Sequence, residues 1–275
     1  MGIVINQDSL KKLIIDKLKE KNDDIKKQWS SPEGTATRYF YIDDLLPVEI
    51  ASLIFDAFPK DGEAFHKRES FRERKSTLAE LAKTSTLLGD VTTAFQFSDV
   101  IEEISSAIDM KSLHADSSLY AGGLSMMFPG DFLNPHIDNS HDGDRKMYRR
   151  LNLLYYVTPN WKLEDGGNFE LWNSDVTVPN TIVSRFNRLV VMETNDSSWH
   201  SVSPVTSSAS RCCVSNYYFS NESPSGADYF HVTSFTGRPG ETSKRFVGLI
   251  DNAIRNTISK VLKTGRGKDE INKIE

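Results

Sequence analysis

The sequence predicts an α+β fold in which a jelly-roll β-core is buttressed by helices at both ends of the chain. Three observations support this prediction. Apolar residues at helical spacing dominate residues 1–117, short β-rich runs fill residues 118–236, and helical spacing returns within residues 237–275. Because residues 1–275 contain no internal repeat and no long linker, we expect these three parts to form a single domain.

The N-terminal part is expected to be mainly helical. Apolar residues at helical spacing predict helices over residues 8–29, 47–58 and 77–109. Alternation predicts a short strand at residues 38–42. The polar, charged segment 60–76 is expected to be a solvated loop, and its alternative interpretation is a mobile lid over a site.

Short runs rich in Val, Leu, Tyr and Phe are expected to form the strands of the β-core, because Gly, Pro, Asn, Asp and Ser separate them. Eight strands suit a jelly roll. The runs cover residues 119–128, 135–138, 150–158, 168–171, 181–186, 189–193, 199–203 and 211–220. A helix is expected over residues 242–263, followed by a disordered Lys- and Gly-rich tail.

The bulk composition narrows the classes of protein. The formal net charge of −5 argues against a nucleic-acid partner, which usually meets a basic surplus. The two cysteines, Cys212 and Cys213, are neighbours that cannot staple a fold, and they indicate a reducing compartment. The start of the chain does not resemble a signal peptide, and no run approaches the roughly 20 apolar residues of a membrane span. We therefore expect a cytoplasmic protein with no membrane partner, and its oligomeric state stays open.

The segment Asn134-Pro135-His136-Ile137-Asp138-Asn139 contains two candidate metal ligands. On a strand, residues i and i+2 face the same side, so His136 and Asp138 point together. A converging imidazole and carboxylate suit a borderline or hard divalent metal. The pattern His-X-Asp also occurs by chance, and its alternative interpretation is a hydrogen-bonded core or loop histidine.

A third candidate ligand, His200, opens a later strand after an apolar run and a turn. Two histidines and one carboxylate from a β-core make the facial triad of non-haem Fe(II) oxygenases, which leaves metal positions open. Catalytic zinc uses similar ligand sets, so these three residues alone do not distinguish iron from zinc.

Arg211 begins the last predicted strand of the core. A guanidinium can hold a carboxylate through two parallel hydrogen bonds. Ser215 and Tyr217 share its face of the strand by parity, so this strand is expected to line a pocket. An isolated arginine at a strand end would more simply face water, but beside a metal triad we expect Arg211 to bind a carboxylate.

From about Ser118 to Ser220 the chain resembles the prolyl-4-hydroxylase-like branch of the Fe(II)- and 2-oxoglutarate-dependent oxygenases. The resemblance runs in order through His136-Ile137-Asp138, Arg150-Leu151-Asn152-Leu153-Leu154-Tyr155-Tyr156, Trp161, Asp165-Gly166-Gly167-Asn168-Phe169-Glu170-Leu171, Arg185-Phe186-Asn187-Arg188-Leu189, His200-Ser201-Val202-Ser203-Pro204-Val205 and Arg211. The later segments His231-Val232-Thr233-Ser234-Phe235 and Arg238-Pro239 look like bacterial members of this branch.

The resemblance implies a double-stranded β-helix, the cupin-like form of the jelly roll, and a set of site residues. The metal ligands for Fe(II) would be His136, Asp138 and His200, and Arg211 would complete the catalytic set. Arg211 would hold the distal carboxylate of the cosubstrate 2-oxoglutarate with help from Tyr156, and the other cofactor-binding residues would be Ser215 and Tyr217. O2 would be the oxidant, with ascorbate as a reductant in vitro.

Two positions bear on the reaction that the resemblance implies. Some animal relatives carry tyrosines shortly before the His-X-Asp motif, where this sequence has Phe128 and Leu133. Halogenating relatives replace the ligand carboxylate by a small residue, whereas Asp138 is intact here. The resemblance therefore implies hydroxylation.

The expected activity is hydroxylation of an unactivated C–H bond, first of all in a prolyl residue of a peptide or protein, with release of succinate and CO2. One alternative is a hydroxylase of a free amino acid, sugar or other small metabolite. Another is a cupin-like metal-binding module without oxygenase activity, against which Arg211 and Tyr156 argue. The basic residues Arg68, Arg72, Arg145, Lys146 and Arg149 are expected to be solvated loop charges rather than a site for an acidic substrate.

Overall fold

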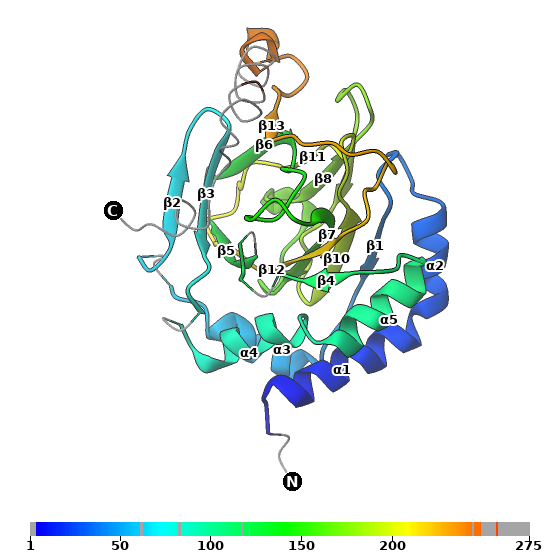
Figure 1. The fold of residues 1–275 in the computed structure, drawn as a ribbon. Helices are drawn as coiled ribbons and strands as arrows, with labels where there is room; N and C mark the ends of the chain where they lie inside the picture. The colour runs from blue at the N-terminus through cyan, green and yellow to red at the C-terminus, as the bar shows by residue number, and fades with distance from the viewer. Residues whose placement is uncertain are drawn as a thin grey trace.

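A curled antiparallel β-sheet forms the centre of the protein, and helices lie against one of its faces (Figure 1). The computed structural model describes residues 4–60, 63–81, 84–116, 118–120, 122–243, 245–248 and 257. The helices are α1 (Gln7–Glu20), α2 (Asn22–Ser30), α3 (Val48–Asp56), α4 (Thr86–Ala94) and α5 (Ser98–Ile108). The strands are β1 (Tyr39–Ile42), β2 (His66–Glu69), β3 (Glu73–Leu78), β4 (His114–Ala115), β5 (Gly123–Met127), β6 (Phe132–Ile137), β7 (Tyr148–Tyr156), β8 (Phe169–Trp172), β9 (Pro179–Ile182), β10 (Arg188–Glu193), β11 (His200–Val202), β12 (Arg211–Ser220) and β13 (Ser234–Phe235).

The main path of the sheet runs in the order β1-β10-β7-β12-β5-β3-β6-β11-β8-β9. The short strands β2, β4 and β13 pair with β3, β12 and β6 respectively. Although β8 and β10 are far apart in this order, Phe169 and Leu171 of β8 pack against Val190 and Met192 of β10. The sheet therefore closes on itself, as the predicted double-stranded β-helix requires.

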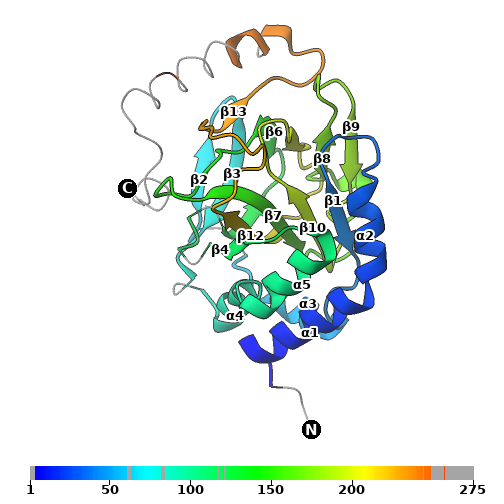
Figure 2. The same cartoon turned by 45° about the vertical axis from the view of Figure 1, so that its right-hand side comes forward.

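The helices cover the outer face of the strands that run from β10 to β5. Leu10, Ile14 and Leu18 of α1 share one core cluster with residues of these strands, among them Leu153 and Val214. In Figures 1 and 2 the helices form a continuous band along this side of the sheet. The central strand β7 is buried on both faces, which explains why its sequence shows no apolar–polar alternation.

The predicted fold class is confirmed, and most core strands lie close to their expected positions. The helix expected over residues 8–29 is divided at Lys21 into α1 and α2, and α1 begins at a capping box formed by Asn6 and Ser9. The helix expected over residues 77–109 is wrong at its start, because Thr77 and Leu78 end β3 and the helical part consists of α4 and α5.

The largest correction concerns residues 60–76, which were expected to form a solvated loop. They contain β2 and most of β3, an antiparallel hairpin that joins the sheet between β5 and β6 (Figure 2). The strand expected at residues 181–186 is also shifted, since β9 spans Pro179–Ile182. Most of the helix expected over residues 242–263, and the tail after it, lie outside the described residues.

Two further expectations can be compared with the structure. Cys212 and Cys213 are both buried and neither forms a disulfide. In the part of the chain that the structure describes, no helix has the length and apolar character needed to cross a membrane.

Candidate functional site

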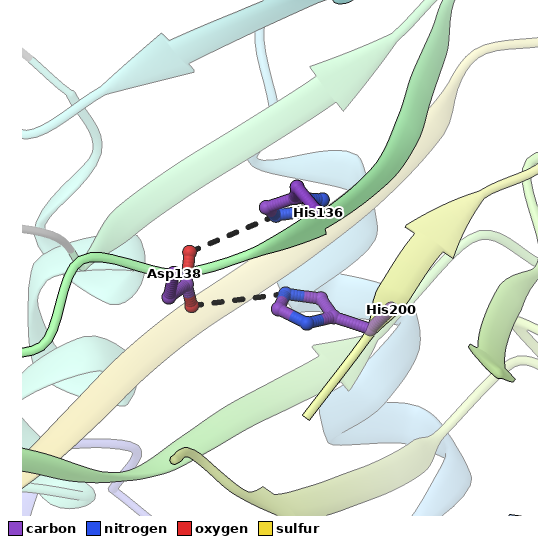
Figure 3. A group of neighbouring side chains, drawn as sticks. All are labelled: His136, Asp138 and His200. Atoms are coloured by element: carbon purple, nitrogen blue, oxygen red, sulfur yellow. Dashed lines mark ion pairs between the residues drawn. The ribbon is translucent and has the colours of Figure 1, made fainter. Parts of the chain in front are cut away.

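The three predicted metal ligands converge where β6 and β11 lie side by side (Figure 3). His136 of β6 and His200 of β11 are direct partners in the antiparallel pairing, and Asp138 follows β6. Asp138 Oδ1 is 3.7 Å from His136 Nε2, and Asp138 Oδ2 is 3.7 Å from His200 Nε2. The candidate ligand atoms of the three residues lie within 4.8 Å of one another. This spread suits a single ion with bonds of about 2 Å.

Backbone contacts fix the tautomers of both imidazole rings. His136 Nδ1 is 2.9 Å from the carbonyl of Asn134, and His200 Nδ1 is 2.9 Å from the carbonyl of Ser198. A carbonyl oxygen only accepts hydrogen bonds, so each Nδ1 donates its proton. Each Nε2 therefore carries a lone pair directed toward Asp138, and this is the arrangement that metal-binding histidines use.

Burial sets the charges of this cluster. Burial, with a further contribution from His200, lowers the pKa of His136 to about 3, and burial also lowers the pKa of His200. Both rings are therefore neutral at neutral pH, and the contacts drawn in Figure 3 join neutral imidazoles to a carboxylate. Burial alone would raise the pKa of Asp138, but the charge of Arg149 is the largest of the opposing contributions, the pKa stays lowered, and the carboxylate is ionised. Two lone pairs and one negative charge thus meet at one point, as binding of a divalent cation requires.

Arg149 is the nearest cation to the carboxylate of this cluster. Its Nη1 lies 3.1 Å from Asp138 Oδ2, and its guanidinium lies 4.3 Å from the ring centre of Tyr217. Arg149 is only 4% exposed, so the expectation that it is a solvated loop charge was wrong. It occupies β7 rather than a loop, and Tyr217 of β12 covers its guanidinium.

Arg211 and Tyr156 lie together in the enclosed interior, as expected, but outside the cavity beside the metal ligands. The guanidinium of Arg211 lies 5.2 Å from the ring centre of Tyr156, and both residues are buried. Arg211 Nη1 donates to the carbonyl of Gly167 at 3.2 Å, whereas Arg211 Nε and the Tyr156 hydroxyl find no hydrogen-bond partner among the described residues. Buried donors without acceptors are costly, so this pair fits a carboxylate ligand.

A glycine turn holds the partner of Arg211 in place. Gly166 has φ +66°, and a Cβ there would lie 1.9 Å from the carbonyl oxygen of Pro204. Only glycine fits such a close approach, so Gly166 has a structural role in this turn. The turn places the carbonyl of Gly167 against Arg211, and that carbonyl also accepts a hydrogen bond from Ser184 Oγ at 2.9 Å.

A cavity of about 190 Å³ opens beside His136 and Asp138. Ser215 and Tyr217 line it, whereas Arg211, which strand parity placed on the same face of β12, is outside its lining. Its other walls come from the β2–β3 hairpin, from β5 and from the loop after β6. Phe230, in the segment between β12 and β13, also lines it.

Three ionic residues of the hairpin are the main feature that the sequence did not identify. Glu73 is 3.1 Å from Lys75 and 3.9 Å from Arg68, and all three line the cavity. Burial alone would raise the pKa of Glu73, but the two cations outweigh it and lower this pKa to about 2. Because Arg74 between Glu73 and Lys75 is charged as well, the sequence shows no alternation that would indicate a strand with one face toward a polar cavity.

Of the five basic residues expected to be solvated, three line the cavity, and Arg72 and Lys146 do not. Arg145 lies 4.2 Å from the ring centre of Phe230 and, like Arg68 and Arg149, belongs to the cavity lining. Lys146 has a side chain that is 76% exposed, as expected.

Comparisons with known proteins agree with this geometry. Residues 122–219 match the family model of the 2OG-Fe(II) oxygenase superfamily. No curated protein sequence matches the chain.

Solved structures with the same fold include two prolyl hydroxylases. One is a prolyl-4-hydroxylase from Pseudomonas putida, with 16% identity, a TM-score of 0.54, and coverage of 74% of this chain and 98% of that chain. The other is a prolyl hydroxylase from Trichoplax adhaerens in complex with a hypoxia inducible factor peptide fragment, with 16% identity, a TM-score of 0.54, and coverage of 75% and 92% respectively.

A third solved structure has a different activity. The non-heme alpha ketoglutarate dependent epimerase SnoN from nogalamycin biosynthesis shares 12% identity at a TM-score of 0.51, with coverage of 82% of this chain and 88% of that chain. At these identities the likenesses establish the fold and leave the substrate open. Residues 122–219, the part of the chain that matches the superfamily model, include His136, Asp138 and His200.

Proposed function

We propose that this protein is an Fe(II)- and 2-oxoglutarate-dependent dioxygenase that hydroxylates an unactivated C–H bond. The observation that carries the proposal is the convergence of His136, Asp138 and His200, with both Nε2 lone pairs directed at one carboxylate. The unpartnered donors of Arg211 and Tyr156 support 2-oxoglutarate as the cosubstrate, because they suit its distal carboxylate.

Iron(II) and 2-oxoglutarate together supply the oxidising chemistry, with O2 as oxidant and succinate and CO2 as co-products. The residues of this chain bind and orient these groups. His136, Asp138 and His200 would hold the metal, and Arg211 with Tyr156 would hold the cosubstrate. The enclosure of this region limits access of water. No side chain of the site needs to act as a general acid or base in this scheme.

A prolyl residue of a peptide or protein is the first candidate substrate. The solved prolyl hydroxylases with this fold support it, and one of them was solved with a peptide fragment. A small metabolite is the second candidate, and the cavity favours it. The cavity of about 190 Å³ has ionic walls, which suit a small polar molecule.

The test is succinate formation from 2-oxoglutarate by the purified protein with Fe(II), ascorbate and O2. Reactions contain either no substrate, a pool of prolyl peptides, or a pool of free amino acids and other metabolites. We expect succinate that depends on iron and is stimulated by one pool. His136→Ala and His200→Ala should each abolish it while circular dichroism shows a folded protein. His114→Ala is the matched control, because His114 is an exposed histidine of β4 outside the cluster.

Binding measurements separate a slow enzyme from a wrong proposal. Calorimetry with Mn(II), which replaces iron without turnover, should show binding of 2-oxoglutarate that requires the metal. A protein that produces no succinate and shows no such binding would be a metal-binding module rather than an oxygenase.

A further inference from the structure

An irregularity of strand β7 directs Arg149 into the interior of the sheet. Leu151 and Leu153, the next residues of the same parity, belong to the core cluster shared with the helices. Strict alternation would place Arg149 on that face as well. The pairing of β7 with β12 shifts its register here, however, and Arg150 is left without an opposite residue on β12. Such a bulge re-aims a side chain, and Arg149 therefore lines the cavity instead of packing against the helices.

One carboxylate and two aromatic rings surround the guanidinium of Arg149. Its Nη1 lies 3.1 Å from Asp138 Oδ2, and the ring centres of Tyr217 and Phe219 lie 4.3 Å and 5.9 Å from its central carbon. Among the described residues, Asp138 is the one carboxylate within ion-pair distance, and Arg149 Nε finds no hydrogen-bond partner. A guanidinium does not lose its proton in proteins, so the burial of Arg149 depends on this single ion pair.

The two oxygens of the Asp138 carboxylate have different surroundings. Oδ1 lies 3.7 Å from His136 Nε2. Oδ2 lies 3.7 Å from His200 Nε2 and is also the oxygen that Arg149 meets. Because Oδ2 already shares its negative charge with a guanidinium, it is the weaker of the two donors to a metal ion. Oδ1 is therefore the oxygen that stays available for the metal.

The number of oxygens that Asp138 gives to a metal decides how many positions stay open. A carboxylate binds metal ions through one oxygen or through both. Through both oxygens, Asp138 would fill one of the positions that a site of two histidines and one carboxylate otherwise leaves open. The ion pair with Arg149 opposes this, because the guanidinium and the metal compete for Oδ2 and repel each other. Arg149 thus lowers metal affinity and favours an open position.

We propose that Arg149 is a positioning residue, which restricts Asp138 to one metal-binding oxygen and so keeps a coordination position open. The inference rests on the metal site of the proposed function. It also gives the bulge of β7 a role, since the bulge separates Arg149 from its neighbour Arg150. Arg150 Nη2 lies 3.9 Å from Glu193 Oε1, and Arg150 is outside the cavity lining.

The experiment counts the water molecules bound to Mn(II) in the full chain, in the absence of 2-oxoglutarate. Broadening of the electron paramagnetic resonance lines in water enriched in oxygen-17 reports this number, and calorimetry reports the Mn(II) affinity. We expect about three waters in the native protein, because three protein atoms would occupy a six-coordinate ion. In Arg149→Met we expect about two waters and roughly tenfold tighter Mn(II) binding, because Oδ2 is released and a like charge is removed.

Arg150→Met is the matched control. Arg150 is the neighbouring buried arginine of β7, pairs with a carboxylate of its own and is outside the cavity lining. Its replacement should leave both the number of waters and the Mn(II) affinity at their native values. Arg149→Gln is the second variant if Arg149→Met does not fold. Its neutral amide should likewise release Oδ2 and reduce the number of waters.

Several outcomes overturn the inference while the proposed function stands. These are an equal number of waters in the native protein and the Arg149 variant, about two waters already in the native protein, and equal effects of the Arg149 and Arg150 substitutions. Weaker Mn(II) binding with an unchanged number of waters would assign Arg149 a purely stabilising role and would also overturn it. Failure of the native protein to bind Mn(II) at all would instead remove the proposed function itself.

Discussion

Replacement of Arg211 by Met should weaken 2-oxoglutarate binding while leaving the fold intact. The substitution keeps most of the buried volume and removes a guanidinium whose Nε has no hydrogen-bond partner in the described part of the chain. The carbonyl of Gly167, which accepts from Arg211, keeps its hydrogen bond from Ser184. Two hydrogen bonds to a charged carboxylate contribute about 1.5 kcal/mol each at the low end, so the expected loss is about 3 kcal/mol. This corresponds to a roughly hundredfold rise in Kd.

The assay is calorimetric titration of 2-oxoglutarate into the Mn(II)-loaded protein, together with the Mn(II) affinity of each variant. Arg185→Met is the control, because Arg185 is an arginine whose side chain is 61% exposed and contacts Asp43. We expect unchanged Mn(II) affinity in both variants and weaker 2-oxoglutarate binding in Arg211→Met alone. An unchanged Kd in Arg211→Met would refute the assignment of this residue to the cosubstrate.

Three further predictions concern neighbouring features. Tyr156→Phe removes a hydroxyl that no hydrogen bond of the described residues satisfies, so we expect the Kd of 2-oxoglutarate to rise about tenfold with little loss of thermal stability; a large drop in Tm would contradict this. The pKa of Glu73 is about 2 in the folded protein, below its value in the unfolded chain. Its ionic contacts therefore contribute fully to the free energy of unfolding above about pH 4.5, and this contribution is lost as the pH falls toward 2. In urea titrations of the metal-free protein, Glu73→Gln should therefore flatten the fall of unfolding free energy between pH 5 and 3, and an unchanged slope would be evidence against the ionic contacts of Glu73. Gly166→Ala should lower the free energy of unfolding by at least about 2 kcal/mol, because its Cβ would meet Pro204. The control Gly89→Ala, in open space on α4, should raise that free energy by about 0.5–1 kcal/mol. Similar effects of the two substitutions would refute the role of the turn.

The sequence predicts well those elements whose order of apolar and polar residues is determined by burial of apolar side chains. The strand β12 was expected at residues 211–220 and lies there, because it packs against helices on one face and the interior on the other. The facing positions of Ser215 and Tyr217 followed from strand parity alone. The triad also followed, since His136 and His200 come from strands that pair directly.

The β2–β3 hairpin was not predictable from apolar pattern. Its strands read His-Lys-Arg-Glu and Glu-Arg-Lys-Ser-Thr-Leu, which have low β-propensity and many charges. They form strands because β3 has backbone partners on both β5 and β6, and because their inward side chains meet one another and a polar cavity. These contacts offset the low β-propensity of the hairpin, but they join residues far apart in the sequence, and the local sequence does not indicate them.

The prediction for Arg149 failed for a related reason. A basic residue beside Lys146, Tyr148 and a second arginine, Arg150, favours a solvated loop. The structure buries Arg149 because Asp138 neutralises it and Tyr217 covers it. Neither partner is near Arg149 in the sequence.

The position of the hairpin in the sheet bears on how this protein can diverge. The hairpin forms one wall of the cavity through Glu73 and Lys75, yet His136, Asp138 and His200 all come from other parts of the chain. Mutations in the hairpin can therefore alter which molecules are accepted without altering the metal ligands. Selection for a new substrate would act mainly on this hairpin, while the metal-binding strands stay constant, and recombination of hairpins between relatives would be a direct route to new specificities.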